Sequence, residues 1–253
     1  MADPLSELIQ AVAAADNSES LLEAVVNLAE ARLEGAIPEL IAALSYNNPG
    51  AAVAAVDGLI QLGELAVVPI MEQLDRHNYT ARAWATRAMA GIGDPRGLVT
   101  LLDAATSDIT MSVRRAAARG LGAIKWHWFP GELLDGARQE ALSALLFVVQ
   151  KDEEWVVRYA AIVGLQMLAE ATPELRSPLL SQFERMAASD STVAVCARAQ
   201  MAHHQLQASL RSRSDVEERP SPLTAADWQR VQEELETYRK TIETNAESFI
   251  LGS

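Results

Sequence analysis

The side chains best suited to bind a ligand lie in one short stretch of the chain. Arg82 and Arg87 occur there together with Tyr79 and Trp84. A guanidinium group binds a carboxylate through two parallel hydrogen bonds, and an aromatic face stacks on a planar group. The stretch therefore predicts a site for a planar anion. A solvated helix face would also accommodate the two arginines, and Trp84 is equally suited to core packing.

A second aromatic cluster consists of Trp126, His127 and Trp128. It lies in residues 126–131, which interrupt a repeated sequence pattern. Insertions in repeat proteins usually fall in loops on one face, which is often the binding face. Three consecutive rings cannot all be buried, so we expect at least one of them to face a ligand or a partner.

The remaining reactive side chains predict neither a metal site nor a catalytic nucleophile. The four histidines have no His-Glu-x-x-His spacing. His203 and His204 are adjacent, so on a helix they point about 100° apart and do not bind one ion together. Cys196 lies in an apolar helical segment, where a buried and unreactive thiol is expected. The sequence also contains no Gly-rich phosphate loop and no Gly-x-Ser-x-Gly elbow.

An internal repeat supplies the elements that must position these residues. The string Val-Arg-Arg-Ala-Ala at 113–117 returns as Val-Arg-Tyr-Ala-Ala at 157–161. In each copy an aspartate stands six residues before the first arginine: Asp108 before Arg114, and Asp152 before Arg158. This spacing predicts a structural ladder that ties stacked helix pairs together, although a ligand-facing role for the arginines stays open.

The repeated pattern predicts an all-α fold. Helix–turn–helix units of about 30 to 40 residues follow one another, with Pro near helix starts and Gly at helix ends. Four units are clear and weaker ones lie at either end, as is typical of a solenoid. We therefore expect a right-handed α-solenoid of HEAT-like helical repeats over residues 1–210. Arg82 and Arg87 do not align with the ladder position of the later units.

A polar segment and one further helix follow the repeats. Residues 211–222 are rich in Ser and charge and predict a linker. In residues 223–253, Thr224 and Asp227 form a capping-box variant and Leu223 with Trp228 a hydrophobic staple. The apolar residues of this amphipathic helix form one narrow seam: Trp228, Val231, Leu235, Tyr238 and Ile242. The last repeat or another protein is expected to cover this seam, so the helix is a capping or partner-binding element.

Composition narrows the class of partner. Hydrophobic residues make up 49% of the chain and aromatic residues only 5%, which favours an Ala-rich helical array. The net charge of −13 argues against a nucleic-acid partner. One cysteine excludes an internal disulfide framework and fits a reducing compartment. No secretory signal and no membrane-spanning stretch is evident, so we expect a cytoplasmic protein without membrane insertion.

Four strings, at 36–41, 46–63, 78–95 and 112–122, resemble a known family. They are similar to the E/F-type phycobilin lyases of cyanobacteria, and closest to the F-type subunit for the phycocyanin alpha chain. The Tyr-Asn-Asn-Pro-Gly and Asn-Tyr-x-Ala-Arg-x-Trp motifs are the most specific part. The resemblance covers roughly residues 5–207, and the C-terminal helix lies beyond it.

The resemblance implies a heterodimer with an E-type subunit. Such a pair binds a linear tetrapyrrole of the phycocyanobilin type and attaches it to a cysteine of the apo-phycocyanin alpha chain. The acceptor supplies the thiol, so the lyase needs neither a nucleophile nor a cofactor of its own. Tyr79, Arg82, Trp84, Arg87 and Asp94 match in type the groups that such a pigment requires. The alternative is a non-catalytic HEAT-repeat adaptor that contacts phycobiliproteins during phycobilisome assembly or disassembly.

Overall fold

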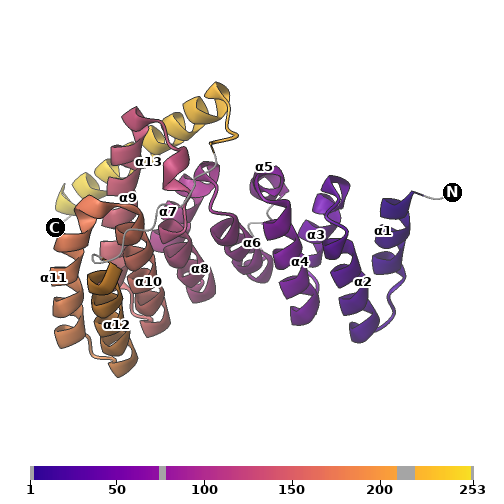
Figure 1. The fold of residues 1–253 in the computed structure, drawn as a ribbon, viewed down its shortest axis with the longest axis horizontal. Helices are drawn as coiled ribbons and strands as arrows, with labels where there is room; N and C mark the ends of the chain where they lie inside the picture. The colour runs from indigo at the N-terminus through magenta and orange to yellow at the C-terminus, as the bar shows by residue number, and fades with distance from the viewer. Residues whose placement is uncertain (1–2, 74–77, 210–219, 252–253) are drawn as a thin grey trace.

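The computed structural model describes residues 3–73, 78–209 and 220–251, with side chains up to residue 244. In these ranges every regular element is a helix, so the predicted all-α class is confirmed. The helices form two layers that curve along the chain (Figure 1). The inner layer contains α2 (Ser18–Glu30), α4 (Pro49–Leu62), α6 (Tyr79–Ile92), α8 (Met111–Gly122), α10 (Trp155–Ala171) and α12 (Val193–Ser209). The outer layer contains α1 (Pro4–Ala14), α3 (Ile37–Ala43), α5 (Glu64–Gln73), α7 (Leu98–Ser107), α9 (Gly131–Lys151) and α11 (Pro173–Ser189).

Local signals set the ends of the repeat helices. Asn48 and Asn78 are the N-caps of α4 and α6, and each side chain accepts a hydrogen bond from a backbone N–H of the first turn. Gly63 and Gly93 follow these two helices with φ of 64° and 66°. Glycine occupies such left-handed conformations without steric cost, so both helices end where the sequence predicts.

Small residues hold the inner helices close together. A Cβ added to Gly120 of α8 would lie 2.6 Å from the Cβ of Ala90 on α6. A Cβ on Gly122 would lie 2.7 Å from the Cα of Gly164 on α10. The inner helices therefore approach more closely than helices with large side chains at the contact can. Close packing on one side makes the array curve, and the inner layer lines its concave side (Figure 1).

A ladder of ion pairs ties each inner helix to the turn of the next repeat. The Nε atoms of Arg82, Arg114 and Arg158 lie 3.1, 2.7 and 2.8 Å from the carboxylates of Asp108, Asp152 and Asp190, respectively. Each arginine also donates from Nη2 to the second carboxylate oxygen, so each pair is bidentate. Arg82 is the fourth residue of its helix, as Arg114 and Arg158 are of theirs. The prediction that Arg82 lies outside the ladder position is therefore wrong.

Cys196 occupies the next ladder position. It is the fourth residue of α12 and stands six residues after Asp190. Its Sγ lies 3.2 Å from the carbonyl oxygen of Asp190, as Arg158 Nη1 lies 3.0 Å from that of Asp152. Cys196 is partly buried, whereas the sequence predicted a buried residue at this position.

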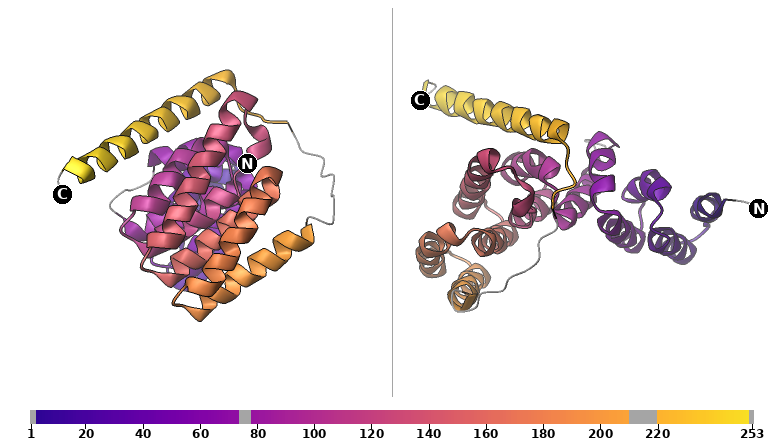
Figure 2. Two further views of the ribbon diagram at one scale, coloured as in Figure 1. Left: turned by 90° about the vertical axis from the view of Figure 1, so that its left-hand side faces the viewer. Right: turned by 45° about the horizontal axis from the view of Figure 1, so that its top comes forward.

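The C-terminal helix α13 (Ala225–Leu251) lies over the outer layer (Figure 2). Its most extensive contacts are with α7 and with the short helix η2 (Pro95–Gly97). The capping box is present, because Thr224 N donates to Asp227 and Asp227 N donates to the Thr224 hydroxyl. Val231 and Leu235 of the seam are buried, whereas Ile242 is exposed. The seam is covered by this chain, but in the middle of the array rather than at the last repeat, and residues 210–219 of the predicted linker lie outside the described residues.

The aromatic insertion takes part in holding α13. It forms the short helix η3 (Trp126–Trp128) followed by Phe129. Trp126 stacks on Phe129 with ring centroids 5.4 Å apart, and Phe129 meets Trp228 of α13 at 5.1 Å. Arg239 of α13 forms an ion pair of 2.6 Å with Glu140 of α9. The insertion and the C-terminal helix therefore form one packed unit on the outer side.

Candidate functional site

Three arginines lie on the concave face in the middle of the array. Each inner helix packs on its outer partner and on the inner helices before and after it, which leaves one side exposed to solvent. On α8 this side carries Arg115 and Arg119, which are four residues apart and both exposed. On α6 it carries Arg87, which is also exposed. The concave face is thus basic at α6 and α8.

The packing register brings these arginines to one level. The ladder pair Arg82–Asp108 places the N-terminal ends of α6 and α8 side by side, so the two helices run parallel. The close approach of residues 120 and 90 sets their offset. The same offset puts Arg87 at the level of residue 117, between Arg115 and Arg119. Since packed helices lie about 8–10 Å apart, the three side chains share one patch, called here the arginine patch.

The next inner helix continues the same face with apolar side chains. Tyr159, Val163 and Met167 of α10 are spaced four residues apart and are partly exposed. Arg198 of α12 lies over the Tyr159 ring at 5.9 Å, and burial lowers its pKa. The concave face therefore joins a positively charged patch to an apolar one, which suits an elongated apolar molecule that carries negative groups.

The first predicted cluster divides between three places. Arg87 is on the concave face and lies 5.5 Å from the ring centre of Trp84, which is partly buried against the core. Arg82 is held by Asp108 and by the Thr110 hydroxyl. Tyr79 is 65% exposed at the start of α6, two helical turns from Arg87. The structure therefore brings together only Arg87 and Trp84.

Asp94 and the aromatic insertion are placed away from the concave face. The carboxylate of Asp94 is buried and forms an ion pair of 2.8 Å with Arg96. Trp126 and Trp128 are buried, and of the three consecutive rings only His127 is exposed. A role for Asp94 near pyrrole N–H groups would require breaking its pair with Arg96.

Sequence reasoning missed Arg115 and Arg119. The signal was present, because both occur in the same string as the ladder residue Arg114 and four residues apart. An arginine that directly follows a ladder arginine points about 100° away from it on the helix. The fourth position of the predicted helix at residues 79–92 is Arg82, so the same rule would have assigned Arg82 to the ladder and Arg87 to a different face of the helix.

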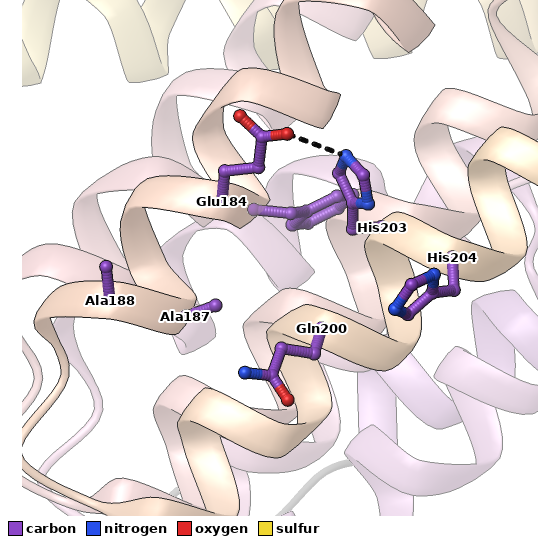
Figure 3. Close-up of a pocket in the computed structure, with 7 residues that line it drawn as sticks. Glu184, Ala187, Ala188, Gln200, His203 and His204 are labelled. Carbon is purple, nitrogen blue, oxygen red and sulfur yellow. Dashed lines mark ion pairs between the residues drawn. The ribbon is translucent and has the colours of Figure 1, made fainter.

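A hollow of about 270 Å³ lies between α11 and α12 (Figure 3), at the far end of the array from α1 (Figure 1). His203 Nε2 lies 3.1 Å from Glu184 there, while His204 points along a different side of α12. The volume of this hollow is below the range of about 300–1,000 Å³ common for ligand pockets. Within the described ranges no group of three metal-binding side chains comes together, and none of the helices there is long and apolar enough to cross a bilayer.

The fold and the repeat ladder define a HEAT-repeat protein, and residues 67–166 match the family model for HEAT repeats. The chain is 57% identical to phycocyanobilin lyase subunit beta of Pseudanabaena tenuis, over 98% of this chain and 93% of the relative. It is 52% identical to the phycocyanin alpha phycocyanobilin lyase CpcF of Synechocystis sp., over 69% of this chain and 81% of the relative. The chain belongs to the phycocyanobilin lyase beta-subunit family, which confirms the resemblance seen in its motifs.

A solved structure supports the same assignment. The complex of CpcE and CpcF of phycocyanin lyase from Nostoc sp. PCC7120 contains a chain that matches with a TM-score of 0.63 and 49% identity. The match covers 66% of this chain and 98% of that chain. The shared part is therefore nearly the whole of the Nostoc chain, and about a third of the present chain lies outside it.

Proposed function

We propose that the chain is one subunit of a heterodimeric bilin lyase. The pair binds a linear tetrapyrrole of the phycocyanobilin type and promotes its attachment to a cysteine of the phycocyanin alpha chain. The observation that carries the proposal is the 57% identity to a phycocyanobilin lyase subunit beta over 98% of this chain. Similarity of this extent goes beyond the residues that any HEAT repeat requires.

The chemistry is an addition in which the acceptor supplies the nucleophile. The thiol sulfur bonds to a carbon of the ethylidene group on the first pyrrole ring, and the thiol proton goes to the neighbouring ring carbon. No group leaves and no redox step occurs. The work of the lyase is to hold the pigment in one conformation beside the acceptor, and such positioning can lower a barrier by about 7–11 kcal/mol at most.

The partner of this chain is an E-type lyase subunit, as in the solved complex of CpcE and CpcF. We place the pair in the cytoplasm and expect it to use no cofactor besides the bilin substrate. The single cysteine of the chain, Cys196, lies at the ladder edge rather than on the concave face, which fits a nucleophile supplied by the acceptor.

Reconstitution tests the proposal. The chain, its E-type partner, the apo alpha chain of phycocyanin and phycocyanobilin are combined, and covalent pigment is measured by absorption after denaturation in acidic urea. We expect attachment only when both subunits and the acceptor cysteine are present, and a Cys→Ser acceptor is the matched control. A pair that forms a complex with the acceptor but neither binds nor attaches pigment would instead favour an adaptor in phycobilisome assembly.

A further inference from the structure

We propose that Arg87, Arg115 and Arg119 bind the two propionate groups of the bilin, while its pyrrole rings extend toward Tyr159, Val163 and Met167 of α10. The inference rests on the proposed function and names the residues of this chain that orient the pigment. The sequence nominated Arg82 and Arg87 to bind carboxylates; the inference keeps Arg87 and assigns this role to Arg115 and Arg119 instead of Arg82.

The arginine patch is unusual because its charges are not balanced. The chain has 34 acidic and 21 basic residues, so carboxylates are abundant. Yet Arg87, Arg115 and Arg119 form no ion pair with any described residue, whereas the neighbouring Arg82 and Arg114 each hold a carboxylate with two bonds. Three adjacent cations repel one another, so the patch is a place where an anion from outside would relieve an unfavourable interaction.

The dimensions of the arginine patch suit two carboxylates on one small molecule. Arg115 and Arg119 are separated by one helical turn, about 6 Å along the axis of α8. On the parallel helix α6, Arg87 lies at a height along the helix axis between those of Arg115 and Arg119. A linear tetrapyrrole carries its two propionates on neighbouring central rings, so a compact group of guanidinium forks can hold both at once.

The surroundings of the arginine patch suit the rest of the pigment. The partly exposed Ala83 of α6 is small and leaves the guanidinium groups accessible, and Met111 of α8 is an exposed apolar side chain one turn before Arg115. On one side the apolar residues of α10 offer flat and flexible contacts for conjugated rings. On the other side Asp57 of α4 is exposed, which ends the positive region. The pigment is therefore directed from the arginine patch toward α10 rather than toward α4.

The experiment compares phycocyanobilin with its dimethyl ester, in which both carboxylates are neutral. Affinities are measured by absorption titration with the heterodimer, for the wild-type chain and for the triple variant R87Q/R115Q/R119Q. We expect the wild type to bind the free acid at least tenfold more tightly than the ester, since hydrogen bonds to charged groups are the strong ones. The triple variant should lose this preference and bind both forms with the affinity of the ester.

R185Q is the matched control. Arg185 is exposed on the outer helix α11 and also forms no ion pair with the described residues, so its replacement changes the net charge in the same direction. It should keep the wild-type preference for the free acid. Far-ultraviolet circular dichroism and size-exclusion chromatography establish that the variants fold and pair with the E-type subunit.

The outcomes separate the inference from the proposed function. A triple variant that still prefers the free acid overturns the inference, while the lyase function stands. A triple variant that folds but no longer pairs with the E-type subunit also overturns it, because the arginines then belong to a protein interface. A wild-type pair that binds neither form of the pigment overturns the proposed function and the inference together.

Discussion

The arginine side chains of α6 and α8 occur in two settings that differ in their electrostatics. Those of the ladder are fixed by bidentate pairs with turn aspartates, whereas those of the arginine patch are exposed and form no ion pair with the residues that the structure describes. Both kinds occur next to each other in the same helices, as Arg114 and Arg115 do on α8. Whether a given arginine stabilises the fold or is available to a ligand is therefore decided by its direction on the helix.

Stability should distinguish the two settings. R82Q leaves the carboxylate of Asp108 without its bidentate partner, and we expect the free energy of unfolding to fall by about 1.5–3 kcal/mol. R87Q removes only an exposed contact with Trp84, and the loss should be at most about 1 kcal/mol. Urea unfolding followed by circular dichroism at 222 nm measures both. Equal losses for the two variants would contradict the assignment of Arg82 to the ladder.

Acid should weaken the ion pair between Arg158 and Asp190, which is the last pair of the ladder. The hydrogen bonds from Arg158 lower the pKa of Asp190, and the backbone N–H of Thr192 acts in the same direction. A carboxylate whose pKa is lower in the folded state stabilises the fold fully above the unfolded value of about 3.9, and this contribution is lost as pH falls toward the folded value. The difference in unfolding free energy between wild type and D190N should therefore be constant from pH 7 to 5 and shrink below about pH 4.

The same urea series on D57N provides the comparison, because Asp57 is exposed and forms no ion pair with the described residues. If the difference between wild type and D190N did not change between pH 5 and pH 3, the charge pair with Arg158 would not contribute to stability.

At the scale of helices, close packing of α8 on α10 depends on glycine. A Cβ on Gly122 would meet the backbone of Gly164, which cannot move aside as a flexible side chain can. We expect G122A to lower the unfolding free energy by about 1–3 kcal/mol, which is the range for overpacking a tight contact. G131A is the control, because a Cβ at Gly131 meets nothing within 4 Å. Thermal unfolding of both variants tests the prediction, and equal midpoints would contradict it.

Helix boundaries could be predicted from sequence because they are set locally. Asn48, Asn78, Gly63 and Gly93 act within one turn of their own helix. The position of α13 could not be predicted, because the seam of Trp228 and its neighbours indicates an apolar surface but not which surface covers it. The Trp126–Phe129–Trp228 stack joins residues about a hundred positions apart, and no spacing rule within one helix reports such a contact.

At the scale of the whole molecule, the solenoid makes stability a sum of neighbour contacts. A central helix such as α8 packs on α6, α7, α9 and α10, whereas the main contacts of α1 are with α2 and the short helix η1 (Glu34–Ala36). Opening of α1 therefore exposes little buried surface. We expect its backbone amides to exchange with deuterium much faster than those of α8 and α10. Equal protection in all three helices would show that the array unfolds only as one unit.

The candidate site could be predicted less completely than the fold, for a physical reason. Repeats reveal the fold because the same local pattern recurs, and Arg87 could be nominated because arginine binds carboxylates wherever it is exposed. Which arginines are already paired depends on the register between neighbouring helices. That register is set by contacts such as Gly120 against Ala90, and these are not encoded in the spacing of residues along one helix.

Each repeat contributes one residue to each of two ion pairs. Its aspartate accepts hydrogen bonds from the arginine of the repeat before it, and its arginine donates hydrogen bonds to the aspartate of the repeat after it. A tandem copy of such a unit would therefore leave every charge matched, and the array could have grown by internal duplication without a compensating mutation. Cys196 replaces the donor that a further unit would need. An aspartate in the turn of a further unit after α12 would therefore face a thiol instead of a guanidinium group, and it would lack the ion pair that joins the earlier units.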